Sequence, residues 1–431
     1  MNMAGATTAD PGSAATQPDR WQPDLVSWNT TGRCNLRCSH CYLKAGEAGP
    51  GELSLEEGRQ LIDQLVAAGT KMLILTGGEP LMRRDTVPLA AHASSRGLLV
   101  VLGTNGMLLN PRLVEELKEA GVAGVGISLD SLDLAKHDAF RGVSGAWEGA
   151  VRGLRLCVAQ GLPVLLQMTV LPWNYGEVEE VLEFSHREGA TAFNLYFLVC
   201  TGRGERLSDI TPEQYEQALG SLVEAQRRYP RMMVRARCAP QITRIASQGT
   251  SALVGNAGCL AARQYCRITP TGQVTPCPYL PLVAGSVRRQ AFGDIWQAAP
   301  LLERLRYGTP GGRCGSCDFL KLCGGCRARA FALTGDILGE EPWCSYHPAG
   351  RLAAQEEVHA HWTAEAQERL QRIPGFLRPR VKVAVERYAE SHGEEAITLA
   401  TMAAAFEALG RGLPFHRPQA RGASHAPGAD S

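Results

Sequence analysis

Short apolar runs alternate with helix-like segments through the first half of the chain. Apolar residues recur at helical spacing in five segments, which predict helices: Leu55–Ala68, Thr86–Arg96, Pro111–Ala120, Ala146–Gln160 and Glu177–Glu188. Six mostly apolar runs beside them predict strands covered on both faces: Leu25–Asn29, Met72–Thr76, Leu98–Gly103, Gly124–Asp130, Val164–Leu171 and Ala192–Val199. The alternation predicts an α/β fold with a parallel sheet, either doubly wound or curled into a partial barrel.

The alternation of strands and helices ends after Arg206. Apolar residues at helical spacing predict one further helix, Thr211–Arg228. The stretch Gly258–His347 is dense in Gly, Pro and Cys. A stretch of this composition needs cross-links to stabilise its fold, and metal clusters would supply them. We therefore expect six parts: a disordered leader (1–22), a barrel core (23–206), a linking region (207–257), a Cys-rich extension (258–350), a small helical domain (351–415) and a disordered tail (416–431).

Composition narrows the class of protein. The 431 residues include 44 basic and 43 acidic side chains, so no overall charge attracts nucleic acid or an anionic membrane. The longest apolar runs, such as Leu162–Pro172, are shorter than the roughly 20 residues that span a bilayer. The N-terminal residues lack the basic and apolar regions of a secretory signal. We expect a cytoplasmic protein without a nucleic-acid or membrane partner.

Cysteine is the informative residue. With 14 Cys and no export signal, metal or redox chemistry is favoured over a disulfide framework. Three lie together near the start, and eight more crowd one later segment: Cys259, Cys266, Cys277, Cys314, Cys317, Cys323, Cys326 and Cys344. The remaining Cys157, Cys200 and Cys238 are scattered, and we expect all three to be packing residues.

The first group is Cys34, Cys38 and Cys41, on the loop after the first strand. Three closely spaced thiolates can hold an iron–sulfur cluster and leave one iron open to a substrate or cofactor. The alternative is a zinc site with His40 as fourth ligand. It is disfavoured because His40 directly precedes Cys41, which makes a tetrahedron hard to close.

This CxxxCxxC motif resembles the radical S-adenosylmethionine (radical SAM) enzymes, and the resemblance covers about Val26–Val199. His40 stands where that family often has an aromatic residue. The run Gly77-Gly78-Glu79-Pro80 resembles the family's segment for the methionine amino group. The two glycines would let the backbone approach the ligand closely, and Glu79 could accept a hydrogen bond from the ammonium group of the methionine part.

Further positions at strand ends resemble cofactor contacts of the same family. Ser128 and Asp130 resemble its ribose-contacting pair, and Asn105 follows the third strand where members line the cofactor. Arg141 lies in a segment that resembles one after the ribose pair, where it could meet a carboxylate or form a surface salt bridge. A parallel barrel builds its active site at these strand ends.

The resemblance implies a fold and a reaction. The fold would be a partial (β/α)6 TIM-like barrel with a Cys-rich Fe–S extension and a small helical C-terminal domain. Cys34, Cys38 and Cys41 would be the catalytic ligands of a 4Fe–4S cluster that binds S-adenosyl-L-methionine. An electron from a low-potential donor such as ferredoxin or flavodoxin would give methionine and a 5′-deoxyadenosyl radical, which abstracts a substrate hydrogen.

The later cysteines resemble the SPASM extension of radical SAM enzymes, which carries auxiliary 4Fe–4S clusters. The resemblance implies that one cluster is held by Cys259, Cys266, Cys277 and Cys326, and a second by Cys314, Cys317, Cys323 and Cys344. Two departures concern Cys266, which is additional to the commonest pattern, and Cys326, which follows a gap of only two residues. A pair of structural zinc sites is the alternative.

Within that group, Leu195–Gly204, Cys266–Gly272, Pro276–Pro281 and Cys323–Arg329 resemble enzymes of alternative haem and haem d1 synthesis. A tetrapyrrole would need apolar walls and cationic partners, for which the candidates are Arg203, Arg267, Tyr279, Arg327 and Arg329. A solvated turn is the alternative for Arg203. Residues 362–376 and several apolar positions up to Met402 resemble the small helical domain that ends one chain of light-independent protochlorophyllide reductase, or a docking module without substrate meaning.

These resemblances imply a radical SAM enzyme, of oxidoreductase or lyase type, that modifies a tetrapyrrole side chain by oxidative decarboxylation or side-chain removal. One alternative is a maturase of a ribosomal peptide, although few residues precede the first strand to form a peptide-binding domain. The other is a non-enzymatic Fe–S electron carrier, which the intact Gly77–Pro80, Ser128 and Asp130 disfavour.

Overall fold

A computed structural model of the protein describes residues 21–207, 209–248, 258–347, 361–373 and, except for 383, 384, 387, 390 and 391, residues 381–408. The expected leader, apart from positions 21 and 22, and the expected tail lie outside the described residues. Within the described residues, no helix has both the length and the apolar character needed to cross a bilayer.

One ten-stranded sheet dominates the structure. Its strands are β1 (Leu25–Thr31), β2 (Met72–Gly77), β3 (Leu99–Thr104), β4 (Val122–Ser128), β5 (Val164–Val170), β6 (Ala192–Phe197), β7 (Met233–Arg237), β8 (Tyr265–Ile268), β9 (Gln273–Thr275) and β10 (Gly285–Ser286). Strands β1 to β7 are parallel and adjacent in chain order, β8 pairs in parallel with β1, and β9 and β10 extend that edge antiparallel. The expected parallel α/β fold is confirmed.

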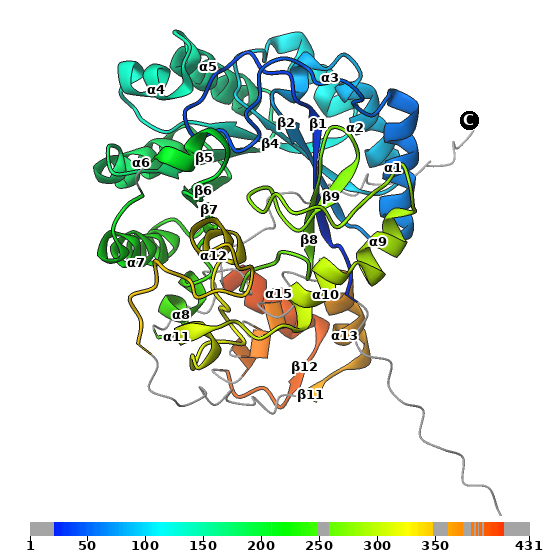
Figure 1. Cartoon of the computed structure of the whole chain (residues 1–431). Coiled ribbons are helices and arrows are strands. Elements are labelled where there is room, and N and C mark those ends of the chain that lie inside the picture. Colours follow the sequence, from blue (N-terminus) through cyan, green and yellow to red (C-terminus); the bar gives the residue numbers. More distant parts are fainter. Residues whose placement is uncertain are drawn as a thin grey trace, which may run out of the picture.

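Helices follow the parallel strands and lie along the outer side of the curved sheet (Figure 1). They are α1 (Leu55–Ala67), α2 (Thr86–Ser95), α3 (Pro111–Glu119), α4 (Leu134–Arg141), α5 (Ala146–Ala159), α6 (Val178–Arg187) and α7 (Pro212–Arg228). Helix α1 starts with the capping box that Ser54 and Glu57 form. The short α4 was not among the expected helices, because only eight residues separate its N-cap from its glycine C-cap.

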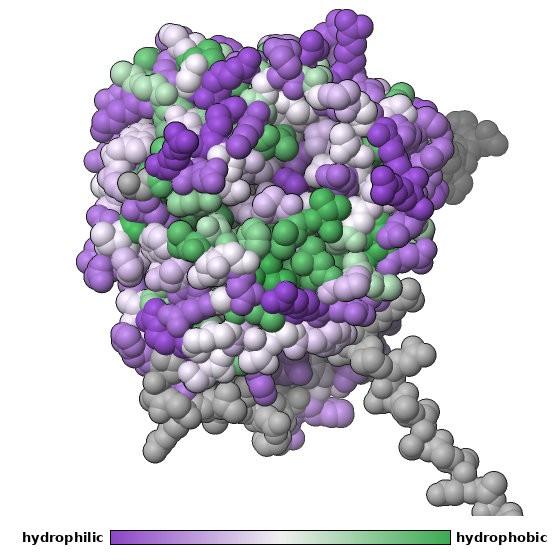
Figure 2. Space-filling view, in the orientation of Figure 1, coloured by the Kyte–Doolittle hydropathy of each residue, from purple (hydrophilic) through white to green (hydrophobic). Residues whose placement is uncertain are grey.

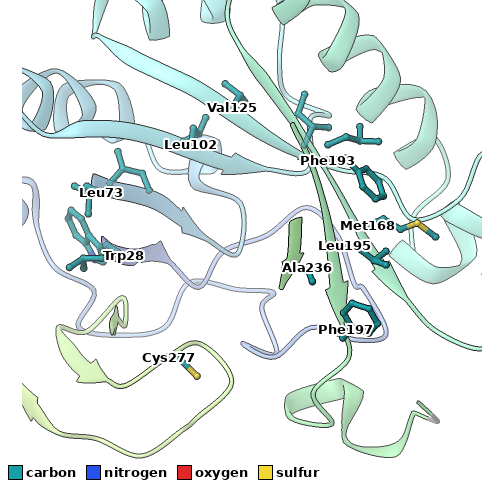
Figure 3. Close-up of a cluster of buried hydrophobic side chains, with 14 of the residues drawn as sticks. Trp28, Leu73, Leu102, Val125, Met168, Phe193, Leu195, Phe197, Ala236 and Cys277 are labelled. Carbon is teal, nitrogen blue, oxygen red and sulfur yellow. The ribbon is translucent and has the colours of Figure 1, made fainter. Parts of the chain in front are cut away.

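Side chains alternate between the two faces of the sheet. On β1, Trp28 is fully buried against α1, where a Cβ added at Gly58 would lie 2.6 Å from the Trp28 ring. Figure 3 shows Trp28 with Leu73, Leu102 and Val125 from the next three strands in this buried layer. Because successive residues point to opposite faces, the intervening positions Ser27 and Asn29 face the barrel interior.

Residues 209–248, most of the region expected to link the barrel to the extension, continue the sheet. Helix α7 and strand β7 form a seventh helix–strand unit, and β8, from the Cys-rich extension, joins the opposite edge beside β1. The sequence of β7 is Met-Val-Arg-Ala-Arg, in which polar and apolar residues alternate. A search for continuous apolar runs misses such a strand, since one of its faces is polar.

Helix α8 (Ile242–Ser247) follows β7, and the described helices of the extension are α9 (Phe292–Ala298), α10 (Pro300–Tyr307), α11 (Gly312–Gly315) and α12 (Arg327–Thr334). On the face drawn in Figure 2, hydrophobic residues gather over the region of β8, β9 and α9, and hydrophilic residues surround them.

The C-terminal unit has a hydrophobic core of its own. Its parallel strands β11 (His361–Trp362) and β12 (Ala396–Ile397) accompany helices α13 (Ala364–Gln371) and α15 (Leu399–Ala408). Trp362 is buried in this core and donates to Glu386 at 2.9 Å. A separate core is what an independently folding domain requires.

Candidate active site

The loop after β1 brings together Cys34, Cys38 and Cys41, as the motif predicts. Backbone amides donate to two of the sulfurs, Leu36 N to Cys34 Sγ and Ala45 N to Cys41 Sγ, both at 3.4 Å. Burial raises the pKa of Cys34 to about 11, with smaller contributions from the charges of Cys38 and Cys41. Thiols that sit together under amide donors fit the ligand set of an iron–sulfur cluster, whose sulfurs accept such bonds.

Gly77 and Gly78 pack tightly against the backbone of the segment that follows β1. A Cβ at Gly77, whose φ is +145°, would lie 2.5 Å from the Thr31 carbonyl oxygen. A Cβ at Gly78 would lie 2.2 Å from the Arg33 carbonyl oxygen. Both glycines therefore allow a close approach to the backbone that leads into Cys34, and their close approach to a ligand stays a prediction.

Glu79 is fully buried and links three segments. Its carboxylate accepts from Leu81 N, Thr104 Oγ1 and Asn105 N at 2.8–3.0 Å, and burial raises its pKa to about 7. Asn105 in turn donates to Asn35 Oδ1 at 2.7 Å. The glutamate thus holds the end of β3 beside the cysteine loop, and its contact with an ammonium stays a prediction.

Asp130 is paired with an arginine of the chain. Its fully buried carboxylate accepts from Arg141 at 2.6 Å and from Thr169 N at 2.9 Å, and its contact with a ribose stays a prediction. Arg141 therefore meets a carboxylate of the chain itself, and it also donates to Cys38 Sγ at 3.8 Å. The pair ties β4, α4 and β5 to the cysteine loop. Ser128 is half-buried at the end of β4, and its ribose contact stays a prediction.

Four arginines expected near substrate bind backbone carbonyl groups of the protein. Arg203, in the turn Gly202–Arg206, donates to the carbonyls of Cys38 and Ala45, each at 2.8 Å. The buried Arg329 donates to Leu198 and Cys238, and Arg327 donates to Gly339 at 2.8 Å. Arg267 donates to Thr275 Oγ1 and the Pro278 carbonyl. Each of the four therefore holds part of the chain's own backbone, and a contact of any of them with substrate stays a prediction.

The inner face of the barrel is polar and carries two arginines that sequence reasoning missed. Arg235 and Arg237 alternate with apolar residues on β7 and pair in register with Asn194 and Tyr196 of β6. Nε of Arg237 is buried and has no hydrogen-bond partner in the described part of the chain. The alternation along β7 is the signal that would have revealed them.

Aromatic side chains stand beside these arginines. The charges of Arg237 and Arg235 oppose the rise in the pKa of Tyr196 that burial causes, so both guanidinium groups lie near its hydroxyl. The rings of Tyr42 and Tyr279 meet edge to face with centroids 5.2 Å apart. Tyr279, expected to line the site, therefore lies within a group of interior tyrosines.

A second set of four cysteines lines one cavity in the extension. They are Cys314, Cys317, Cys323 and Cys344, the four expected for the second auxiliary cluster. Backbone amides of Glu341, Phe319 and Gly325 donate to the first three sulfurs at 3.3–3.5 Å. A thiol-lined cavity with amide donors fits a four-thiolate cluster.

A third group differs from the expectation. Cys259, Cys277 and Cys326 come together, and the neighbouring fourth thiol is Cys238, whereas Cys266 lies apart beside Arg306. Among the described residues, no three His, Cys, Asp or Glu side chains are arranged to hold a single metal ion. Cys157 is buried in the core on α5, as expected for a packing residue.

Three regions of the chain match known families. Residues 28–185 match the Radical SAM superfamily, 259–327 match the SPASM iron–sulfur cluster-binding domain, and 362–405 match the proto-chlorophyllide reductase 57 kD subunit. The first two matches coincide with the barrel and with most of the Cys-rich extension.

Similar proteins include enzymes of two kinds. The chain is 39% identical to an AdoMet-dependent heme synthase of Methanosarcina barkeri over 76% of this chain and 97% of that protein. It is 33% identical to a pre-heme d1 synthase of Dinoroseobacter shibae over 74% and 85%. A PqqA peptide cyclase of Granulibacter bethesdensis is 31% identical over 77% and 89%. The crystal structure of Streptococcus suis SuiB bound to S-adenosylmethionine has a TM-score of 0.64 at 17% identity, covering 75% of this chain and 78% of that one, which shows a shared fold.

A parallel α/β barrel with a three-cysteine loop and two further cysteine groups defines an iron–sulfur enzyme. The chain belongs to the radical SAM enzymes that carry a SPASM domain. Its cofactors are 4Fe–4S clusters and S-adenosyl-L-methionine.

Proposed function

We propose that this enzyme modifies a carboxylate-bearing side chain of an iron-containing tetrapyrrole, by oxidative decarboxylation or side-chain removal. The relatives named for heme and pre-heme d1 synthesis support the proposal. The structural observation that carries it is the basic and aromatic barrel interior around Arg235, Arg237 and Tyr196.

The interior suits a flat anion. Guanidinium groups recognise carboxylates through paired hydrogen bonds, and the buried Nε of Arg237 has no hydrogen-bond partner among the residues that the structure describes. Tyr42 and Tyr279 offer aromatic surface to a macrocycle. A buried donor atom without a hydrogen-bond partner costs free energy, which a hydrogen bond to a substrate carboxylate would offset.

The residues around the cofactor have distinct tasks in this proposal. S-adenosyl-L-methionine, when bound at the Cys34–Cys41 loop, supplies the radical that abstracts a substrate hydrogen. Arg203 and Glu79 hold that loop and the adjacent turn in place, and Arg141 places a positive charge beside Cys38. A low-potential ferredoxin or flavodoxin as electron donor, and a cytoplasmic location, remain predictions.

Anaerobic absorbance titration of the reduced enzyme with iron-coproporphyrin and related intermediates tests binding, and mass spectrometry of turnover mixtures tests the reaction. Arg237→Gln should weaken binding by about 10- to 150-fold, because a hydrogen bond to a charged group contributes about 1.5–3 kcal/mol. The exposed Arg206→Ala is the matched control. The proposal is wrong if no tetrapyrrole in the series shifts the spectrum or yields product.

A peptide maturase is the second candidate, because the PqqA peptide cyclase is similar over most of both chains. The two candidates differ in substrate, not in cofactor. Modification of a precursor peptide encoded beside this protein, together with no tetrapyrrole turnover, would favour the maturase.

A further inference from the structure

Four cysteines at the ends of four separate elements lie close enough for their charges to act on one another. Cys238 follows β7, Cys259 precedes β8, Cys277 follows β9, and Cys326 is the N-cap of α12. We propose that Cys238 is the fourth thiolate ligand of the auxiliary iron–sulfur cluster held by the other three, and that Cys266 is not a ligand. This inference is independent of the substrate proposed above.

The backbone at Cys238 is held in an unusual conformation. Its φ is +59°, a left-handed conformation that costs free energy in any residue with a Cβ. Two donors fix its carbonyl oxygen, the Tyr215 hydroxyl and Arg329 Nη1, each at 3.0 Å. A packing cysteine needs no such conformation, whereas a ligand must point its sulfur in one direction.

The same buried groups position Cys326. Arg329 lies 3.4 Å from the carboxylate of Glu341, and that carboxylate accepts from Cys326 N at 2.8 Å. One arginine–glutamate pair therefore connects the carbonyl of Cys238 with the amide of Cys326. As the N-cap of the eight-residue α12, Cys326 also stands at the helix end that favours a negative sulfur.

The other two thiols, Cys259 and Cys277, lie near Cys326, since the charges of Cys259 and Cys326 both act on Cys277. A Cβ at Gly258, next to Cys259, would lie 2.9 Å from the Cys323 carbonyl oxygen, so this segment packs on the loop that leads to Cys326. Cys277 accepts at its carbonyl from Thr275 Oγ1 at 3.1 Å. Burial raises the pKa of Cys238, and the charges of Cys326, Cys277 and Cys259 raise it further, as expected for neighbouring thiols.

Cys266 faces the opposite side of the sheet. On β8 it pairs with Val26 of β1, whose side chain is buried in the helix-covered layer, as is Ile268, the partner of Trp28. Its neighbours on β8, Tyr265 and Arg267, face the interior, where Tyr265 lies 2.8 Å from Ser27 Oγ. Burial raises the pKa of Cys266, and the charge of Arg306 on α10 opposes that rise. To reach the cluster, β8 would have to shift its register by one residue.

The test uses the full chain with Cys34, Cys38 and Cys41 replaced by Ala, so that only auxiliary clusters remain. After anaerobic reconstitution this parent should hold about eight iron atoms per chain. Adding Cys238→Ala should lower the iron content by at least about one atom per chain, and an auxiliary cluster that remains there should give the Mössbauer spectrum of a three-iron cluster. Adding Cys266→Ser, the matched control, should leave iron content and spectrum unchanged.

Alkylation of the unsubstituted holoenzyme provides a readout that does not depend on folding of a variant. Cys238 should be protected while the clusters are bound and should become at least about tenfold more reactive after iron is chelated, in step with Cys259. Cys266 should stay unreactive in both states because it is fully buried. Full iron content in the Cys238→Ala variant, unchanged Cys238 reactivity after chelation, or loss of iron from the Cys266→Ser variant would each overturn the proposal.

Discussion

At the residue scale, cationic side chains do much of the positioning around the cysteine groups. Arg203 donates to two carbonyl oxygens of the first cysteine loop, and Arg141 donates to the sulfur of Cys38. Arg329 donates to the carbonyl of Cys238 and forms an ion pair with Glu341. Each fixes backbone or sulfur, and each adds positive charge near thiolates. Positive charge near thiolates favours their deprotonated, metal-binding form.

Arg203→Ala should loosen the first cysteine loop. The change removes two hydrogen bonds from a charged donor, each worth about 1.5–3 kcal/mol. We expect reconstituted enzyme to lose iron from the first cluster faster in the presence of a chelator, with the auxiliary clusters unaffected. Iron release followed by absorbance measures this, with the exposed Arg206→Ala as control. Equal release rates in both variants would contradict the assignment.

Asp209 should make stability depend on pH. Its side chain is 1% exposed, and burial raises its pKa to about 6 although Arg329 lowers it. The folded protein therefore binds this proton more tightly than the unfolded chain does, and its contribution to stability falls as pH rises from about 4 to about 6. The loss is at most about 3 kcal/mol.

Asp209→Asn keeps an acceptor for Ile210 N and removes the titration. The difference in melting temperature between the original protein and this variant should change in favour of Asn as pH rises through that range. The exposed Glu303→Gln serves as control. A pH-independent difference between Asp209 and Asn would show that the carboxyl titrates normally.

At the element scale, turns after the strands are set by backbone packing. Gly77 and Gly78 are needed because carbonyl oxygens of residues 31 and 33 occupy the space of a side chain. The turn Gly202–Arg206 reaches the same loop from β6, and Gly202 has a left-handed φ of +63° against Tyr42. The first cysteine loop therefore packs between these two turns.

Gly78→Ala should displace the turn from the cysteine loop, since the added methyl group would overlap a backbone oxygen rather than a flexible side chain. We expect a loss of at least about 2 kcal/mol in stability and more than tenfold slower cleavage of S-adenosylmethionine. Thermal unfolding and 5′-deoxyadenosine formation measure the two effects. Gly176→Ala, whose added Cβ meets open space, should change neither.

At the scale of the whole molecule, the barrel and the extension form one continuous structure. Strand β8 of the extension pairs with β1, and α12 delivers Arg329 to the carbonyl of Leu198, just after the end of β6. The cavity with Cys314 and Cys344 lies in the extension, outside the first cysteine loop. Loss of that cluster should therefore spare the first one.

Cys344→Ala should separate cofactor cleavage from substrate turnover. The variant should lose about four iron atoms, keep some formation of 5′-deoxyadenosine, and form no final product, because the barrel site stays intact. Iron analysis and product chromatography measure these quantities, with Cys157→Ala as a control outside the cysteine groups. Normal product formation by the Cys344 variant would show that this cluster has no part in turnover.

The sequence by itself determined what local spacing encodes: the strand–helix alternation, the CxxxCxxC loop and the cysteine group of the cavity, since these residues are close along the chain. Only the tertiary structure decided which distant groups meet. Because side chains alternate between the two faces of a strand, Cys266 lies on the helix-covered face of β8 and Arg237 on the interior face of β7. The end of β7 places Cys238 near Cys326, which is 88 positions later in the numbering. The hydrogen-bond partners of the arginines were likewise not predictable from the sequence, because they lie in segments far apart along the chain.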